Sequence, residues 1–254
     1  MTSTTLKLIA LVLMLCDHIH QFIGGAPIWL TWLGRISAPL FFFCTIWGIY
    51  YTHNRKKYLL HMYLWGIGMG IGDFVLSVLV PNPHSLPVNN VFVTLLLVGI
   101  IVSIIELYQN GEKTLFWKLF FAFIAMQIVS TILCFFSLRY AQFPMLQGIP
   151  GSILPNLLFC EGSIVFVAMG VTLYFTRNNK VKMSLWFFAF CLIFIPFGAL
   201  STMLSKNYQW MMVFALPLML LYNGKKGKGM KWLFYIFYPA HVFLLCWLGS
   251  FVSF

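Results

Sequence analysis

An aspartate and two histidines interrupt an apolar stretch near the start of the chain. Residues 13–21 read LMLCDHIHQ, which places Asp17, His18 and His20 among leucine, methionine and isoleucine. A charged side chain in lipid costs at least about 2.5–3.5 kcal/mol, so it needs a partner or a function. Histidine is the commonest general base in enzymes because it exchanges protons near neutral pH. This stretch is therefore the first candidate for a catalytic site.

Membrane helices must position these side chains, because the chain is too apolar for a soluble domain. Its 254 residues are 61% hydrophobic and 8% charged, and the mean hydropathy is +0.90. Long apolar runs without period-two alternation favour spanning helices over a barrel. We predict an all-α polytopic membrane protein, with one domain over residues 1–254 and a single bundle of about nine helices. The expected spans are Leu6–Gly24, Ser37–Thr52, Tyr58–Val80, Val91–Leu107, Leu115–Leu138, Pro155–Thr176, Met183–Leu204, Tyr208–Leu221 and Met230–Val252.

The positive charges alternate between the two sides of these spans. The chain has 16 lysines and arginines and a net charge of +11. All but Arg35, Arg139 and Lys206 fall in connections on one side, which the positive-inside rule assigns to the cytoplasm. We expect a multi-pass protein of the plasma (inner) membrane with a cytoplasmic N-terminus and an external C-terminus. Topology explains the basic charge, so we predict no nucleic-acid partner.

A histidine near the C-terminus reaches the same depth as His18. His18 follows Lys7 by eleven positions, and His241 follows Lys231 by ten. At about 1.5 Å per helical residue, each histidine lies roughly 15–16 Å beyond its lysine. We therefore predict that the first and last helices are neighbours, and that Asp17, His18 and His241 share one chamber near the middle of the membrane.

The remaining charges in the spans lie nearer the external side. Arg35 could pair with Asp73 or Glu161, either as a structural ion pair or as part of an acceptor-side surface. Consecutive helical residues point about 100° apart, so Asp17 should reach a cation or another helix rather than clasp His18. No complete set of metal ligands is evident, and we predict no metal site.

Several stretches of the chain resemble the TraX family. They are KLIALVLMLCDHI (7–19), GRISAPLFFF (34–43), THNRKKYL (52–59), NNVFVTLLLVGI (89–100) and YNGKKGKGMKWLFYIFYPAH (222–241). The resemblance covers essentially the whole chain, while FCEGSIVFVAMG (159–170) is only loosely similar. The family's named member acetylates the pilin N-terminus of conjugative F-type plasmids. The family is also similar to transmembrane acyltransferases, many of which carry a basic residue, ten residues and then a histidine, as Lys7 and His18 do.

This resemblance implies a membrane acetyltransferase that uses acetyl-coenzyme A as a co-substrate, with no tightly bound cofactor. His18 would be the general base, Asp17 would orient it or stabilise its charged form, and His241 would hydrogen-bond to a substrate or the intermediate. Cytoplasmic cations would hold the donor phosphates, and the glycines of NGKKGKG could let the backbone approach them. These cations are Lys7, Arg55, Lys225, Lys226 and Lys228.

Two matters stay open in the sequence. The acceptor is an amine or hydroxyl of an extracytoplasmic or membrane-associated molecule, such as a pilin or peptide N-terminus or a surface glycan. Acetyl-coenzyme A, membrane lipids and this unknown acceptor are the expected partners. The alternative function is a proton-coupled permease or a lipid or glycan flippase, because such proteins use midplane Asp and His residues as proton relays.

Overall fold

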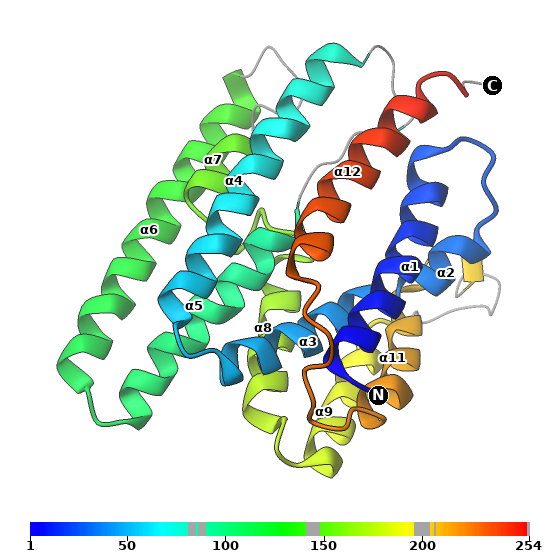
Figure 1. Ribbon diagram of the computed structural model, residues 1–254. Coiled ribbons are helices and arrows are strands. Elements are labelled where there is room, and N and C mark those ends of the chain that lie inside the picture. Colours follow the sequence, from blue (N-terminus) through cyan, green and yellow to red (C-terminus); the bar gives the residue numbers. More distant parts are fainter. Residues whose placement is uncertain (81–84, 86–89, 141–147, 196–203, 206, 253–254) are drawn as a thin grey trace. The chain divides into compact units, whose positions relative to one another are not determined.

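The computed structural model describes residues 1–80, 85, 90–140, 148–195, 204–205 and 207–252 (Figure 1). Every regular element within these residues is a helix, which confirms the predicted all-α membrane class. The chain divides into two compact units. Unit 1 comprises residues 1–47, 82–85 and 175–254, and unit 2 comprises residues 48–81 and 86–174. Each unit is described by itself.

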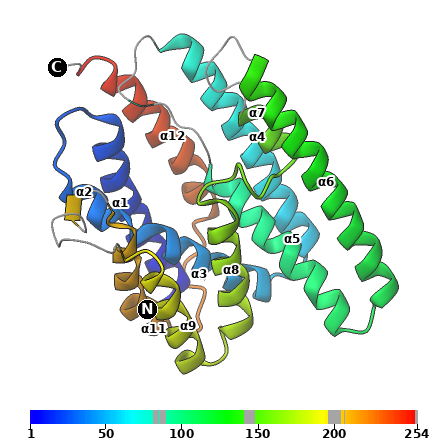
Figure 2. The same cartoon turned by 180° about the vertical axis from the view of Figure 1, so that it is seen from behind.

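Unit 1 brings the two ends of the chain together. Helix α1 (Ser3–Phe22) lies beside α12 (Lys231–Gly249), as both Figure 1 and Figure 2 show. A short turn after α1 folds α2 (Trp29–Gly34) back against it, and α3 (Ser37–Tyr51) follows, as far as Trp47 within this unit. The rest of the unit consists of α9 (Lys180–Leu192), the 3-10 helix η1 (Gln209–Phe214) and α11 (Ala215–Leu220).

Unit 2 consists of long helices and one interrupted segment. Helices α4 (Arg55–Leu79), α5 (Val91–Gln109) and α6 (Lys113–Tyr140) follow one another in the chain, and each packs on the next. The short α7 (Gly148–Ile153) contacts both α4 and α6. Helix α8 (Ser163–Thr176) completes the unit as far as Tyr174.

Not every one of the nine expected spans is a single long helix in the part of the chain that the structure describes. Within the described ranges, six helices are long and apolar enough to cross a membrane: Ser3–Phe22, Trp29–Tyr51, Arg55–Leu79, Val91–Gln109, Lys113–Arg139 and Lys231–Gly249. The second begins at Trp29, earlier than the expected Ser37. The sixth to eighth expected spans correspond to shorter helices, α8, α9 and the pair η1 and α11. Part of the expected span Met183–Leu204 lies outside the described residues.

The sixth expected span is shortened because its first residues form a non-helical segment. The backbone amides of Leu158 and Phe159 donate to the side chain of Asn156, which replaces a helical turn with a local one. Gly162 and Ser163 then take left-handed conformations, with φ of 69° and 51°. A left-handed glycine followed by a left-handed serine cannot continue a helix, so α8 begins only at this point.

Polar side chains of α6 hold this non-helical segment inside unit 2. The Gln127 amide donates to the Pro155 carbonyl at 2.8 Å and accepts from the Leu157 amide at 2.8 Å. Ser130 donates to the Leu154 carbonyl at 2.5 Å. Gln127 lies fourteen residues into α6, so it is roughly 21 Å from the start of that helix. At that depth a membrane protein must satisfy non-helical backbone internally, and α6 supplies the partners.

Candidate active site

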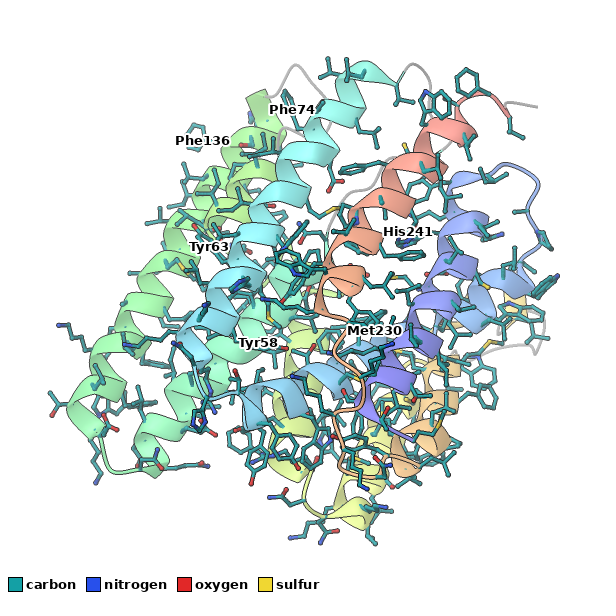
Figure 3. The ribbon with its side chains drawn as sticks, in the orientation of Figure 1. Tyr58, Tyr63, Phe74, Phe136, Met230 and His241 are labelled. Carbon is teal, nitrogen blue, oxygen red and sulfur yellow. The ribbon has the colours of Figure 1, made fainter. Side chains whose placement is uncertain are left out.

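A direct contact between two histidines forms the centre of the candidate site in unit 1. His18 Nδ1 and His241 Nε2 are 2.6 Å apart, and the two rings stack with centroids 4.9 Å apart at 14°. In Figure 3, the labelled His241 belongs to α12, the helix beside α1. The prediction that the first and last helices are neighbours, with these two histidines together, is confirmed.

The partner of the second His241 nitrogen determines where the protons lie. His241 Nδ1 is 2.6 Å from the carbonyl oxygen of Phe237, which can only accept a hydrogen bond. Nδ1 must therefore carry the proton, and Nε2 of a neutral His241 must accept. It follows that His18 donates from Nδ1 to His241. The lone pair of a neutral His18 is then on Nε2, to which no described residue hydrogen-bonds.

This geometry changes the role expected for His241. The sequence suggested that His241 would hydrogen-bond to a substrate or the intermediate. Both of its ring nitrogens instead contact protein groups, one on His18 and one on the Phe237 carbonyl. His241 is buried, with 5% of its surface exposed, whereas His18 is partly exposed. In this arrangement His241 fixes the tautomer and orientation of His18.

Asp17 forms an ion pair that is separate from the histidine contact. Its carboxylate accepts hydrogen bonds from Arg35 and from the Thr31 hydroxyl. The side chains of Arg35 and Asp17 are 25% and 14% exposed, so the charges are largely removed from solvent and compensate each other. Gly34 packs so closely on Asp17 that any Cβ at this position would collide with the carboxylate.

The partner of Arg35 corrects a prediction. The sequence suggested Asp73 or Glu161, and the structure places Asp17 there instead. The physical reason is the position of α2: it begins at Trp29, so Arg35 lies well inside the span rather than at its external edge. Arg35 Nη1 also donates to Gln209 at 3.1 Å.

The other predicted charges lie in unit 2. Asp73 is 5% exposed, and its Oδ1 has no hydrogen-bond partner within the described parts of the chain. Glu161 precedes the left-handed pair at Gly162 and Ser163, and its backbone carbonyl accepts from Thr94 at 3.0 Å. His20, in unit 1, turns away from the histidine pair and contacts the Ala26 carbonyl at 2.8 Å.

The first turn of α1 is held by the NGKKGKG segment, which we call the lysine loop (residues 223–229). The amides of Ser3 and Thr4 donate to the carbonyls of Lys225 and Lys226 at 2.9 and 3.0 Å. The Thr4 hydroxyl also contacts the carbonyls of Lys226 and Lys228, at 2.8 and 2.7 Å. The loop thus satisfies amides at the start of α1 that have no partner within the helix.

The glycines of the lysine loop serve this contact. Gly227 has a φ of 79°, and a Cβ there would collide with Thr2. The sequence suggested that these glycines let the backbone approach phosphates. In the structure they let three loop carbonyls approach α1, and the approach to phosphates stays a prediction.

Cationic side chains gather around the start of α1. Lys225, Lys226 and Lys228 are exposed. Lys7 is partly buried, lies 5.5 Å from the centre of the Phe234 ring and interacts electrostatically with Lys226. These four predicted donor-binding residues therefore belong to one part of unit 1.

Arg55, the fifth predicted donor-binding residue, lies in unit 2 and is already paired. Its guanidinium forms an ion pair with Glu106, which also accepts a hydrogen bond from the Tyr174 hydroxyl. Arg55 Nη2 lies 3.4 Å from the Tyr174 oxygen. The positive charge is compensated, and these contacts tie α4, α5 and α8 together. We therefore leave Arg55 out of the proposed donor site.

The sequence did not reveal several residues that support the histidine pair and the two ion pairs. Thr31 and the Phe237 carbonyl support the charged and basic groups of unit 1, and neither is recognisable from its residue type. Glu106 and Tyr174 were not considered, although an acid one turn before the end of an apolar run is a signal for a buried ion pair. Tyr238 also belongs to the surroundings of the base, because its ring centroid lies 6.1 Å from that of His18.

Fold and site together define an all-α membrane protein with a stacked histidine pair and a compensated Asp–Arg pair in one unit. The chain belongs to the TraX family, because the family model described as TraX protein matches residues 2–145 and 152–249. Among curated proteins it is similar to the probable fimbrial assembly protein FimC, serogroup H1, of Dichelobacter nodosus. The two are 24% identical over 257 residues, which cover 95% of this chain and 93% of that protein. No solved structure matches the chain significantly.

Proposed function

We propose that this protein is an integral membrane acetyltransferase that moves an acetyl group from cytoplasmic acetyl-coenzyme A to an extracytoplasmic acceptor. The observation that carries the proposal is the chain of contacts from the Phe237 carbonyl through His241 to His18. It leaves a basic nitrogen, His18 Nε2, on a helix otherwise rich in apolar residues. Membership of the TraX family supports acetyl transfer, and the likeness to a fimbrial assembly protein supports a pilin or other surface peptide as acceptor.

In this proposal His18 acts as the general base. Its Nε2 takes a proton from the acceptor, which is a neutral amine or a hydroxyl, as that group attacks the thioester carbonyl. The imidazolium that forms keeps its Nδ1–H bond to His241. The carbonyl of Phe237 holds His241 in the accepting tautomer, much as a carboxylate holds the base of a hydrolase triad. His18 then returns its proton to the departing coenzyme A thiolate.

Asp17 and Arg35 act on this base indirectly. Because the carboxylate is held by Arg35 and Thr31, the Asp17–Arg35 unit has no net charge and fixes α2 against α1. We propose that it keeps the backbone on either side of His18 in place. An acceptor bound as a hydroxyl or neutral amine suits this uncharged surrounding.

The donor enters from the side of the lysine loop. Lys7, Lys225, Lys226 and Lys228 lie at the start of α1, and the phosphates of coenzyme A are the anions they would attract. Lys7 precedes His18 by eleven residues, so roughly 16 Å separate the phosphate end of the donor from the reacting thioester. The proposal places the protein in the plasma (inner) membrane, with this end of α1 facing the cytoplasm.

Transfer of labelled acetyl groups tests the proposal. The purified protein in lipid nanodiscs is incubated with acetyl-coenzyme A carrying a radioactive acetyl group, with a pilin N-terminal peptide or a glycan acceptor. We expect transfer by the native protein. In His18→Ala it should fall by at least about 100-fold, the usual contribution of a general base. Free thiol release measures the same turnover independently.

His20→Ala is the matched control for this experiment. His20 lies on the same helix but contacts the Ala26 carbonyl, so its loss should leave the transfer rate within about threefold of the native rate. Equal thermal stability of the two variants in detergent excludes unfolding as the cause. Native rates in His18→Ala would remove His18 from the mechanism.

A proton-coupled permease is the second candidate function. The observation in its favour is Asp73, a buried residue whose carboxyl Oδ1 has no hydrogen-bond partner among the described residues. Proton relays in membranes use such groups. Proton uptake into liposomes that contain the protein, measured without acetyl-coenzyme A, distinguishes the two functions. Uptake that disappears in Asp73→Asn would favour transport.

A further inference from the structure

We propose that Tyr238 is a further catalytic residue, whose hydroxyl stabilises the oxyanion that forms during acetyl transfer. This inference rests on the proposed function. Tyr238 lies on α12, three residues before His241, and residues at this spacing share a helix face. Its ring centroid is 6.1 Å from that of His18 and 5.8 Å from that of His241. The side chain is 6% exposed.

The reaction needs a hydrogen-bond donor beside the base. Attack on a thioester carbonyl places a negative charge on its oxygen, and in an apolar site this charge requires a preorganised donor. A phenolic hydroxyl can donate to an oxyanion without losing its proton, and tyrosine is among the side chains that enzymes use for this purpose. A hydroxyl also rotates, so it can exchange one hydrogen-bond partner for another as the substrate binds.

Two other groups near His18 make hydrogen bonds that support the base and the ion pair. Both nitrogens of His241 are used, one on His18 and one on the Phe237 carbonyl. Arg35 donates to Asp17 and to Gln209. If His241 or Arg35 donated to the substrate instead, a hydrogen bond that supports His18 or Asp17 would be lost. The Tyr238 ring lies against both imidazole rings, so its hydroxyl is a donor that can serve the oxyanion while the His18–His241 and His241–Phe237 contacts stay in place.

The complete step conserves atoms and charge. The acceptor nitrogen or oxygen forms a bond to the carbonyl carbon while its proton passes to His18 Nε2. The π electrons of the carbonyl move to the oxygen, which accepts a hydrogen bond from Tyr238. As the intermediate collapses, the carbonyl re-forms and the carbon–sulfur bond breaks. The thiolate takes the proton from His18, so coenzyme A leaves as a thiol and both side chains regain their starting states.

Tyr238→Phe tests the inference with little change in packing. The ring contacts to His18 and His241 remain, so the melting temperature should stay within about 2 °C of the native value. Loss of one oxyanion donor typically lowers kcat by about 100- to 1000-fold, and we expect that reduction with little change in the KM for acetyl-coenzyme A. Tyr235→Phe, one turn earlier on α12, is the matched control and should retain native kcat.

The pH profile separates an oxyanion donor from a residue that only positions His18. If Tyr238 donates to the oxyanion, Tyr238→Phe should lower the plateau of kcat and leave the acidic limb, which reports His18, at the same pH. A displaced limb with a native plateau would overturn the inference in favour of a positioning role. Native kcat in Tyr238→Phe would also overturn it while leaving the proposed function intact.

Replacing Tyr238 by 2,3-difluorotyrosine gives a second variant that keeps the hydroxyl. Its phenol is a stronger hydrogen-bond donor, so the variant should recover at least the native kcat. A rate as low as that of Tyr238→Phe would overturn the inference, because the hydroxyl would then not be the group that matters. Absence of acetyl transfer by the native protein would instead refute the proposed function, and the inference with it.

Discussion

At the scale of single residues, the site of unit 1 separates a basic group from a compensated charge pair. The sequence places Asp17 and His18 side by side, but helical geometry points them in different directions, and the structure gives them different partners. His18 contacts His241, whereas Asp17 contacts Arg35. The histidine contact could be predicted because two lysines set the depths of two histidines on separate helices.

The partner of Arg35 could not be predicted in the same way. The depth of Arg35 depends on where the second span begins. Gly34 and Arg35 interrupt the apolar pattern, so the pattern alone does not show that the span begins before them. The requirement for Gly34 is visible only once Asp17 is packed against it. The Phe237 carbonyl is a backbone group, so its contact with His241 cannot be predicted from the residue type. Contacts of this kind depend on three-dimensional packing rather than on local sequence.

The Asp17–Arg35 pair allows a prediction of stability. Arg35→Gln leaves a largely buried carboxylate with one partner fewer, and Asp17→Asn leaves a partly buried guanidinium without its counter-charge. Removing one member of a buried pair typically costs about 3–5 kcal/mol. We expect each single variant to lower the melting temperature in detergent, and the double variant Asp17→Asn with Arg35→Gln to recover part of the loss.

A thermodynamic cycle over these four proteins measures the coupling between the two side chains. The Lys182→Gln variant is a control, because Lys182 is exposed on α9 and its loss should leave the melting temperature unchanged. Strictly additive effects of the two single changes would contradict a stabilising ion pair.

At the scale of elements, the long helices follow from sequence and the interrupted ones do not. The apolar runs behind α1, α4, α5, α6 and α12 predict those helices closely, because period and length are local properties. The break before α8 depends on Asn156 and on Gln127, a residue of another helix. The lysine loop pairs with residues more than two hundred positions earlier in the chain, so its role in closing the start of α1 lies beyond any local pattern.

The exposed lysines of that loop lead to a prediction about donor binding. If they attract the phosphates of coenzyme A, the triple variant Lys225→Gln, Lys226→Gln and Lys228→Gln should bind coenzyme A at least about tenfold more weakly at low salt. Salt screens such contacts over about 10 Å at 0.1 M, so the difference from the native protein should diminish as ionic strength rises. Binding is measured by calorimetry in nanodiscs.

The loop backbone should survive these substitutions, because it holds α1 through carbonyl groups rather than through lysine side chains. A control with Lys180→Gln and Lys182→Gln removes exposed cations of α9 and should bind coenzyme A normally. If the triple variant and the native protein bind coenzyme A equally well at low salt, the loop lysines do not bind the donor and serve only to set the membrane topology.

At the scale of the whole molecule, the class of protein was predictable, but the division of some spans into short helices was not. Composition alone excludes a soluble domain, and the family match over residues 2–145 and 152–249 agrees with the resemblance seen in the sequence. The expected spans that differ are those in which short helices replace one long helix. An apolar run reveals that backbone is buried in lipid or protein, but not whether it crosses the bilayer in one continuous helix.

The orientation of the two termini is the prediction at this scale. The cations outside Arg35, Arg139 and Lys206 alternate so that the N-terminus lies in the cytoplasm, and an odd number of crossings then places the C-terminus outside. Single cysteines added before Met1 and after Phe254, in a variant without the six native cysteines, would be labelled in intact cells by a membrane-impermeant maleimide. We expect labelling at the C-terminus only, and at both ends after the membrane is opened.

Labelling of both ends in intact cells, or of neither, would mean an even number of crossings. The shorter helices α8, α9 and η1 with α11 would then have to be reassigned, since the six long helices alone give an even count. The result also tests the proposed function, in which the lysine loop and the start of α1 face the cytoplasm and bind acetyl-coenzyme A.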